Sequence, residues 1–348
     1  MRSKILFICK RRRGYGTGYD LSSGLFNSAG FNQQMMSDLG YPCKLVQVTD
    51  GNDVEREVFA YDPDCAILEA IWVTPKKLQL LKRLYPGVAW IVRLHSETPF
   101  LAGEGVAEDW LHEYSKLGVT LAFNSRRTVD EYKNILSGPI VYLPNYYPVD
   151  WTIPRHTFHN ESLHVGCFGA IRPLKNQLIQ AHAALQFAEI LGKSMEFHIN
   201  TGRFEGHGDP VYKNLVNLFK HSSHKLVQLQ WTDHSDFLQY LKSNVDIGMQ
   251  VSFTETFNIV TADLVNCNVP VVVSNQVFWA SALSKTDTTS VDSIVNSLLF
   301  TWQTRKWGLT AWNKHRLSRT SRQALDVWRK FFSGDKLWES WQYQSQGK

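Results

Sequence analysis

The sequence predicts an α/β protein with two domains, each built around a mainly parallel sheet. Short apolar runs of strand length alternate with helical patterns of ten or more residues, which is typical of right-handed βαβ units. This alternation stops at one turn-rich stretch near the middle of the chain and then starts again. The 348 residues also suit two domains of ~150 residues each.

The first domain is expected to open with a strand at residues 5–9 and a helix over residues 22–39. Apolar runs between turn residues predict the later strands, and apolar residues at helical spacing predict the later helices. Further strands are expected at residues 45–48, 66–68, 89–94, 120–123 and 140–143, and further helices at residues 76–84, 106–117 and 128–135.

The stretch from Asn145 through Pro154 is rich in turn formers and shows no period, as expected of a domain boundary. After it, strands are predicted at residues 163–168, 196–200, 226–229, 247–250 and 270–273, and helices at residues 175–191, 210–220, 235–242 and 258–267. We therefore expect an N-terminal domain (1–150), a linker (151–161), a second domain (162–310), a C-terminal helix (311–332) and a loosely packed tail (333–348).

The composition excludes disordered, collagen-like and coiled-coil chains, because 43% of the residues are hydrophobic and 20% are charged. No apolar run approaches the ~20 residues of a membrane-spanning helix. Four basic residues follow the opening strand, the reverse of a secretory signal, so we expect a cytoplasmic protein, in the host cytoplasm if viral. The net charge of +5 favours anionic partners, and no oligomeric state is predicted.

The cysteines and histidines indicate no metal centre. The five cysteines lie far apart and form no C-x-x-C pair. Two histidine pairs, His156 with His159 and His221 with His224, have a spacing that metal ligands use, but neither has a cysteine or a carboxylate in company. We interpret them as surface histidines and predict no bound metal.

The first candidate binding motif is a glycine-rich loop that includes Gly16 and Gly18, directly after the opening strand. Glycines allow the backbone to approach a ligand closely, and the following helix offers free N–H groups to an anion. The spacing is not that of a dinucleotide fingerprint. A tight turn alone would need the same glycines, so both interpretations stay open.

A second motif, Gly169 with Arg172 and Lys175, lies between the strand at 163–168 and the helix at 175–191. Basic side chains gain nothing from the dipole at the start of a helix, so an anion between them would explain their placement. A diphosphate would receive helix N–H groups, a guanidinium and an ammonium together. Two solvated surface charges are the alternative.

A third motif places Glu255 after the strand at 247–250, at the start of the helix at 258–267, with Asp263 eight residues further on. On a continuous helix the two carboxylates would be ~12 Å apart along the axis and within a quarter turn of one face. That separation suits one carboxylate at each end of a nucleotide sugar. A helix-capping Glu255 and a solvated Asp263 are the alternative.

Over about residues 4–280, the chain resembles the family 4 retaining glycosyltransferases. The resemblance rests on five features in the family's order: the glycine-rich loop, Asn124-Ser125 before a helix, the segment 141–145, Gly169 with Arg172 and Lys175, and Glu255-x7-Asp263 before Pro270. It implies the GT-B fold, with two Rossmann-like domains facing across a cleft and C-terminal helices returning toward the N-terminal domain. It also implies a nucleotide-sugar donor, with a UDP-sugar expected, and no other cofactor.

The resemblance further implies roles for individual residues. Arg172 and Lys175 would hold the donor diphosphate, Glu255 would contact the donor sugar, and Asp263 would bind the ribose. The expected donor-binding set is Gly16, Gly18, Gly169, Arg172, Lys175, Glu255, Thr256, Phe257, Asn258 and Asp263. The sequence departs from the family by having Asp in place of the second Glu, and Asn266-Cys267-Asn268 in place of a small residue and glycine.

His95 follows the strand at 89–94, at the edge where open α/β sheets place ligands. The resemblance implies that a histidine here contacts the donor sugar across the cleft. We therefore expect a catalytic set of His95, Glu255, Arg172 and Lys175. As a lone histidine, His95 could instead be a satisfied core residue.

Between Trp302 and Lys330, eight basic residues are interleaved with four tryptophans. Such a region can bind DNA or an anionic membrane surface, or its tryptophans can pack a C-terminal helix against the first domain while its arginines face water. The expected reaction is sugar transfer with retention to a hydroxyl of a glycan or of a modified base in DNA. A nucleotide-sugar epimerase and a non-catalytic binder of nucleotide sugars or nucleic acid are the alternatives.

Overall fold

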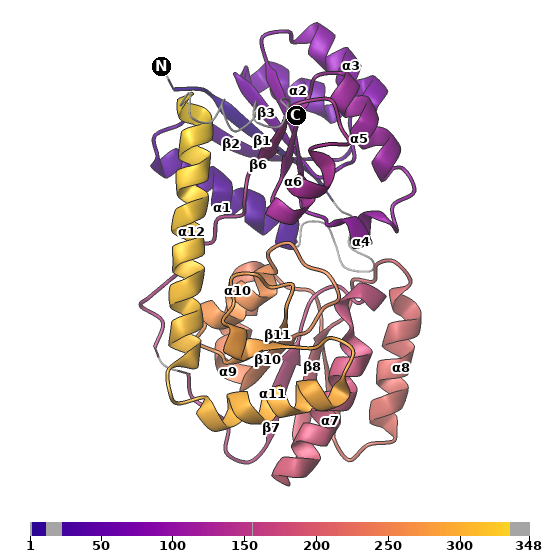
Figure 1. Ribbon diagram of the computed structural model, residues 1–348, viewed down its shortest axis with the longest axis vertical. Helices are drawn as coiled ribbons and strands as arrows, with labels where there is room; N and C mark the ends of the chain where they lie inside the picture. The colour runs from indigo at the N-terminus through magenta and orange to yellow at the C-terminus, as the bar shows by residue number, and fades with distance from the viewer. Residues whose placement is uncertain (1, 12–22, 155, 335–348) are drawn as a thin grey trace. The chain divides into compact units, whose positions relative to one another are not determined.

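The computed structural model describes residues 2–11, 23–154 and 156–334 (Figure 1). Gly16, Gly18 and residues 335–348 of the expected tail lie outside these ranges. The chain divides into two compact units. The described part of the first unit comprises residues 2–11, 23–148 and 320–334, and that of the second comprises residues 149–154 and 156–319.

The first unit contains a six-stranded parallel sheet in the order β2-β1-β3-β4-β5-β6. Its core strands β1 and β3 are apolar except for their last residues and are buried on both faces, as expected of parallel strands covered by helices. The strands are β1 (Ile5–Lys10), β2 (Cys43–Val48), β3 (Cys65–Glu69), β4 (Ala89–Leu94), β5 (Thr120–Phe123) and β6 (Ile140–Tyr142). The helices are α1 (Gly24–Asp38), α2 (Asp53–Tyr61), α3 (Pro75–Leu84), α4 (Thr98–Leu101), α5 (Ala107–Lys116) and α6 (Arg126–Tyr132).

The second unit contains another six-stranded parallel sheet, in the order β12-β11-β10-β7-β8-β9. The strands are β7 (Leu163–Cys167), β8 (Met195–Asn200), β9 (Lys225–Leu229), β10 (Ile247–Gln250), β11 (Val271–Ser274) and β12 (Lys285–Thr286). The helices are α7 (Gln177–Leu191), α8 (Gly208–Lys220), α9 (His234–Asn244), α10 (Ile259–Asn266) and α11 (Val291–Thr304), with short 3-10 turns at Pro173–Lys175 and Ala282–Ser284.

The strand order of the second sheet reverses between β7 and β10. From β7 the chain builds outward to β8 and β9 on one side, and it then returns to add β10, β11 and β12 on the other. In open α/β sheets, ligands bind outside the carboxyl ends of the strands at such a reversal. The two α/β sheets confirm the predicted fold class, and the loops after β7 and β10 become the first place to look for a site.

The last helix, α12 (Leu309–Ser333), ends in the first unit. Trp328 is fully buried there, with its ring centroid 6.0 Å from that of Phe7, and its Nε1 donates a hydrogen bond to the Pro144 carbonyl at 2.8 Å. The expected return of the C-terminal helix to the N-terminal domain is therefore confirmed for this end of α12.

The other residues of the basic, tryptophan-rich region do not follow one pattern. Trp302 packs on Phe187 in the second unit rather than in the first, whereas Trp307 and Trp312 are exposed. Lys314 is buried and donates to the Asn266 carbonyl. The alternative that the tryptophans pack the C-terminal helix on the first domain is therefore wrong for Trp302, Trp307 and Trp312.

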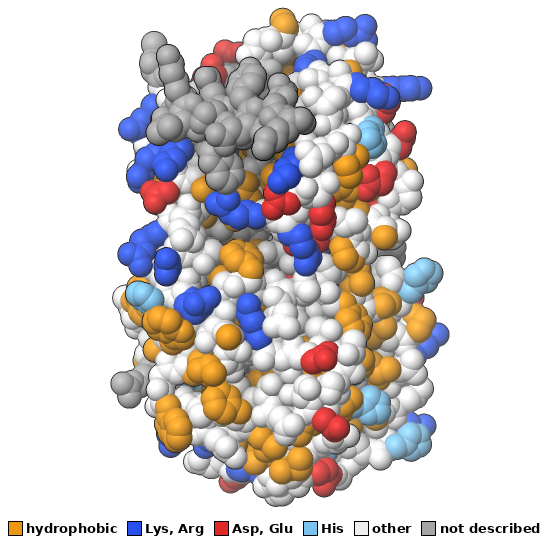
Figure 2. Space-filling model, viewed as in Figure 1, with side chains coloured by type: hydrophobic (Ala, Val, Ile, Leu, Met, Phe, Trp, Pro, Cys, Tyr) orange, Lys and Arg blue, Asp and Glu red, His pale blue; other side chains and the backbone are white. Residues whose placement is uncertain are grey.

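Basic side chains nevertheless line part of the surface. Figure 2 shows Lys and Arg side chains along the edge of this face where Figure 1 draws α12. Within the described part of the chain, none of the helices combines the length and the apolar character that a membrane span requires.

Candidate donor-binding site

The loop after β7 contains Gly169, whose backbone conformation favours glycine. Its φ of 116° lies in a region that other residues rarely adopt. Its N–H donates to Asn200 Oδ1 at 2.9 Å, and a Cβ added here would lie 3.5 Å from Cε of Lys175. The Lys175 side chain therefore extends over the peptide of Gly169.

Lys175 and Glu255 meet at the strand reversal. Lys175 Nζ lies 2.5 Å from Glu255 Oε1, and the two side chains are 11% and 9% exposed. Lys175 belongs to the loop after β7 and Glu255 to the loop after β10. Two of the residues predicted to bind the donor, 80 positions apart in the chain, are thus brought into contact.

Hydrogen bonds hold these two loops together independently of that ion pair. The Phe253 N–H donates to the Leu174 carbonyl at 2.9 Å. Asn176 Nδ2 donates to the Val251 carbonyl at 3.0 Å, and the Val251 N–H donates to Gln180 Oε1 at 2.9 Å. The position of Lys175 relative to Glu255 is therefore fixed by the backbone of both loops.

Arg172 lies in the same loop as Lys175 but has a different acidic partner. Its Nη1 donates to Glu205 Oε2 at 2.8 Å, while Glu205 Oε1 accepts from Arg203. The side chains of Arg172 and Glu205 are 18% and 17% exposed. Each of the two predicted diphosphate-binding cations is thus paired with one carboxylate that water can still reach.

Asp263 lies in α10 and pairs with a residue that the sequence did not single out. Its Oδ1 is 2.8 Å from His234 Nε2, and its side chain is only 3% exposed. Burial lowers the pKa of His234, but the hydrogen bond and the charge of Asp263 outweigh it and raise that pKa above its usual value. The pair therefore favours a protonated His234.

Two helices begin later than predicted, which changes the setting of the motifs. Asn176 has a φ of 57°, so the 3-10 turn at Pro173–Lys175 does not run on into α7, and Lys175 precedes that helix. Asn258 has a φ of 58° and caps α10 by accepting from the Thr261 N–H at 2.8 Å. Glu255 is therefore not on a helix with Asp263, and the predicted spacing of the two carboxylates along one helix face is wrong.

The remaining residues of the predicted donor set lie in the loop after β10. Phe257 is buried against Trp279, whose Nε1 donates to the Phe257 carbonyl at 2.7 Å. The side chain of Asn258 is buried and also donates to Gln250 Oε1 at 3.1 Å. Thr256 is half-buried between Glu255 and Phe257. The Phe257 and Asn258 side chains are thus engaged within the fold.

In the first unit, His95 belongs to a buried polar cluster. Its Nε2 lies 2.5 Å from Glu69 Oε2, and Glu69 also accepts from Arg93 Nη1 at 3.0 Å. Burial lowers the pKa of His95, so its ring is neutral near pH 7. Burial alone would raise the pKa of Glu69, but the Arg93 guanidinium holds it below its usual value. His95 itself is 12% exposed.

The interpretation of the paired histidines as surface residues is wrong for His156 and His224, whose side chains are buried. His159 Nδ1 lies 3.0 Å from Asp246 Oδ1, and the buried side chain of His156 lies 4.0 Å from the same oxygen. His224 is buried and its Nε2 lies 3.1 Å from Glu189 Oε1. Residues distant in the sequence supply these carboxylates, so the spacing of the histidines alone did not reveal them.

Comparison with solved structures decides the fold. Sucrose-phosphate synthase from Thermosynechococcus elongatus superposes with a TM-score of 0.72 at 11% identity, covering 95% of this chain and 100% of that one. The chain has the GT-B fold. The UDP-forming trehalose-phosphate synthase from Burkholderia xenovorans, solved with glucose-6-phosphate, gives a TM-score of 0.67 at 10% identity, covering 95% of this chain and 99% of that one.

A third similar structure is an S. aureus TarM mutant in complex with fondaparinux, alpha-GlcNAc-glycerol and UDP. Its TM-score is 0.61 at 11% identity, covering 77% of this chain and 55% of that one. No protein-family model matches the sequence, and no curated protein matches it. At these identities the likeness establishes the fold, while the chemistry has to be argued from the residues.

Proposed function

We propose that the chain is a glycosyltransferase and that its second unit binds the donor, a nucleoside-diphosphate sugar. The contact of Lys175 with Glu255, made by two loops at the strand reversal, carries this proposal. The similar structures support the choice of donor, because one enzyme is UDP-forming and another structure holds UDP. A UDP-sugar is accordingly the donor that we propose.

The proposed chemistry needs the charges found in these loops. Breaking the anomeric C–O bond leaves positive charge on the sugar and negative charge on the departing diphosphate. Fixed positive groups stabilise such a leaving group, and we assign that role to Arg172 and Lys175. Because both cations now hold carboxylates, a diphosphate would replace Glu205 and Glu255 as their partner. Glu255 would then accept hydrogen bonds from the hydroxyls of the donor sugar.

Two further roles complete the proposal. Asp263, held by His234, is the residue that we propose for the ribose hydroxyls. His95 is the catalytic candidate of the first unit, where Glu69 orients its neutral ring. We also propose transfer with retention of configuration, as in the family that the sequence resembles.

A donor-binding experiment tests the proposal. Nucleoside diphosphates and their sugars, UDP-glucose and UDP-GlcNAc included, are screened for thermal stabilisation of the full chain, because a ligand that binds only the folded state raises Tm. A UDP-sugar should raise Tm, and Arg172→Ala and Lys175→Ala should remove most of that rise. Lys220→Ala, an exposed lysine in the last turn of α8, is the matched control and should keep it. If no nucleotide sugar raises Tm, the proposal is wrong.

Turnover separates the rival functions. The stabilising donor is incubated alone and with acceptors, and sugar products and UDP are then measured. Sugar transfer only in the presence of an acceptor supports the transferase. Conversion of the donor sugar without an acceptor supports the epimerase, and binding without any product supports a non-catalytic protein.

The acceptor is tested in the same assay with glycans and with DNA that carries a hydroxylated base. The exposed Trp307 and Trp312 and the basic side chains of α12 are the features that keep DNA among the acceptors. Binding to DNA through phosphates should weaken steeply with salt. Transfer to a neutral glycan should depend little on salt.

A further inference from the structure

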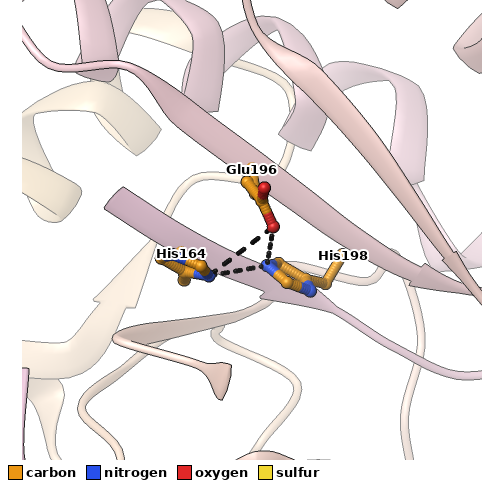
Figure 3. Close-up of side chains that lie close together, drawn as sticks. All are labelled: His164, Glu196 and His198. Atoms are coloured by element: carbon orange, nitrogen blue, oxygen red, sulfur yellow. Dashed lines mark hydrogen bonds and ion pairs between the residues drawn. The ribbon is translucent and has the colours of Figure 1, made fainter. Parts of the chain in front are cut away.

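A second polar cluster lies on strands β7 and β8 of the second sheet, before the carboxyl ends of these strands. His164 is the second residue of β7, and Glu196 and His198 are the second and fourth residues of β8. In the parallel register His164 pairs with Glu196. Alternate residues of a strand share one face, so all three side chains project from the same side of the sheet. Figure 3 shows them pointing toward one another.

The three facing atoms form a compact triangle. His164 Nδ1 lies 3.2 Å from His198 Nε2, and Glu196 Oε2 lies 3.8 Å from each nitrogen. A point equidistant from the corners of this triangle is about 2.1 Å from each, which matches zinc–nitrogen and zinc–carboxylate bond lengths. An ion of this size therefore fits between them as they stand.

Each of the three side chains is also held from outside the triangle. His164 Nε2 lies 2.7 Å from Ser162 Oγ, and His198 Nδ1 lies 2.7 Å from the Tyr240 hydroxyl. Metal-binding histidines are usually fixed in this way through the ring nitrogen that does not bind the metal. The other oxygen of Glu196, Oε1, accepts from Lys225 Nζ at 2.9 Å.

These outer hydrogen bonds are compatible with tautomers whose unprotonated nitrogens face each other. When each outer nitrogen donates to its hydroxyl oxygen, the two facing nitrogens present lone pairs to each other, and these repel unless a cation or a proton lies between them. Burial, with the neighbouring His164 adding to it, lowers the pKa of His198 to about 4. Burial likewise lowers the pKa of His164.

We propose that His164, Glu196 and His198 bind a divalent transition-metal ion, zinc by ligand type, with water completing its coordination. Two histidines and one carboxylate are a ligand set that zinc uses. His198 is buried, whereas 14% of the His164 side chain and 28% of the Glu196 side chain are exposed, which leaves a route for the ion. The cluster is independent of the donor residues, which follow the opposite ends of the strands in the same sheet.

The direct test is titration of the chelator-treated full chain with zinc chloride, followed by calorimetry and by thermal unfolding. We expect one equivalent to bind and to raise Tm, because the ion stabilises only the folded state. His198→Gln and Glu196→Gln should abolish or strongly weaken this binding, and Tyr240→Phe should weaken it about 10- to 100-fold. No saturable binding to the wild-type chain would overturn the proposal.

A variant of another buried histidine serves as the matched control for the zinc titration. His224 is also buried and paired with a carboxylate of the same unit, so His224→Gln disturbs a comparable pair outside the triangle. It should leave zinc affinity unchanged, and equal losses in His224→Gln and Glu196→Gln would overturn the assignment. Glu196→Gln keeps the size of a partly exposed side chain, so its result does not depend on a core substitution that unfolds the chain.

Cobalt substitution identifies the ligand type. A site of nitrogen and oxygen ligands should give the visible bands of tetrahedral cobalt without thiolate charge transfer. A thiolate band would instead assign the metal to a cysteine and overturn the proposal. UDP-sugar stabilisation, measured on the same zinc-free protein, reports on the donor site separately, so failure of one site is distinguishable from failure of the other.

Discussion

Each unit has an ion pair toward the carboxyl ends of two neighbouring parallel strands, but the two pairs differ in burial. In the first unit Arg93 and Glu69 are fully buried at 3.0 Å, near the carboxyl ends of β4 and β3. In the second unit Lys175 and Glu255 follow the carboxyl ends of β7 and β10 at 2.5 Å, and both remain partly exposed. The first pair is sealed within the fold, whereas the second remains partly exposed, as the proposed exchange with a diphosphate requires.

The surroundings of the two pairs explain this difference. Arg93 also donates to the Leu143 carbonyl and to Asn145, and the Trp328 ring lies 5.3 Å from its guanidinium carbon. Every direction around this guanidinium is thus occupied by the fold. Lys175 extends over the bare peptide of Gly169 instead. An ion pair that packing closes off has a structural role, and we propose that the pair beside Gly169 is the one that binds a ligand.

The largest effect is expected from breaking the buried pair. Arg93→Met leaves the Glu69 carboxylate buried without its main partner. Such a change typically lowers the free energy of unfolding by about 3–5 kcal/mol. Urea unfolding should show this loss as a lower midpoint with an unchanged slope. Lys175→Met is the control for the removal of a charge. It should lower the free energy of unfolding by less than about 1 kcal/mol, because partly exposed ion pairs contribute little to stability. Equal losses in the two variants would contradict the comparison.

The second prediction concerns the open pair and follows from the proposed function. Lys175→Met should weaken binding of a UDP-sugar by about 10- to 100-fold, since hydrogen bonds between charged groups contribute about 1.5–3 kcal/mol. Glu255→Gln sharpens the test because it frees Lys175 without changing the shape of the loop. We expect this variant to bind UDP at least as well as the wild type while transferring sugar more slowly. Calorimetry with UDP and a transfer assay separate the two effects, and weaker UDP binding would contradict the proposed exchange.

Much of this comparison could be predicted from the sequence, but the partners of the charges could not. The alternation of apolar runs correctly predicted the core strands, because parallel strands such as β1 and β3 are apolar except at their last residue. It missed α2, a helix of nine residues with only Val54 and Val58 buried, which leaves too little apolar periodicity to detect.

The missed partners share one physical cause. Glu205, His234 and Glu69 lie 24 to 33 residues from Arg172, Asp263 and Arg93, and only the strand order and register bring them together. The same holds for His164 and His198, which lie 34 residues apart on neighbouring strands. Spacing within one segment predicts neighbours on one helix or strand, so it predicted the motifs without their partners. The late helix starts had a local cause, since Asn176 and Asn258 adopt left-handed backbone that propensity alone does not reveal.

The smallest effect is expected from pH, and it should have opposite signs in the two units. The pKa of Glu69 is lowered in the folded state, so its contribution to stability is present above the usual carboxylate pKa and is lost on acidification. The pKa of His234 is raised, so its contribution is complete below the ordinary histidine pKa of about 6.5 and is lost as pH rises through the folded value. Neutral pH is thus where the His234–Asp263 pair begins to weaken.

His234→Gln isolates this contribution because glutamine can still donate a hydrogen bond to Asp263 but carries no charge. The difference in unfolding free energy between wild type and variant should be largest near pH 5 and should shrink as the pH rises toward 8. The matched control is the same substitution at an exposed histidine of the first unit, His112→Gln in α5. A difference that grows with pH would mean that His234 is neutral in the folded chain. The charged pair of His234 with Asp263 inferred from the structure would then be wrong.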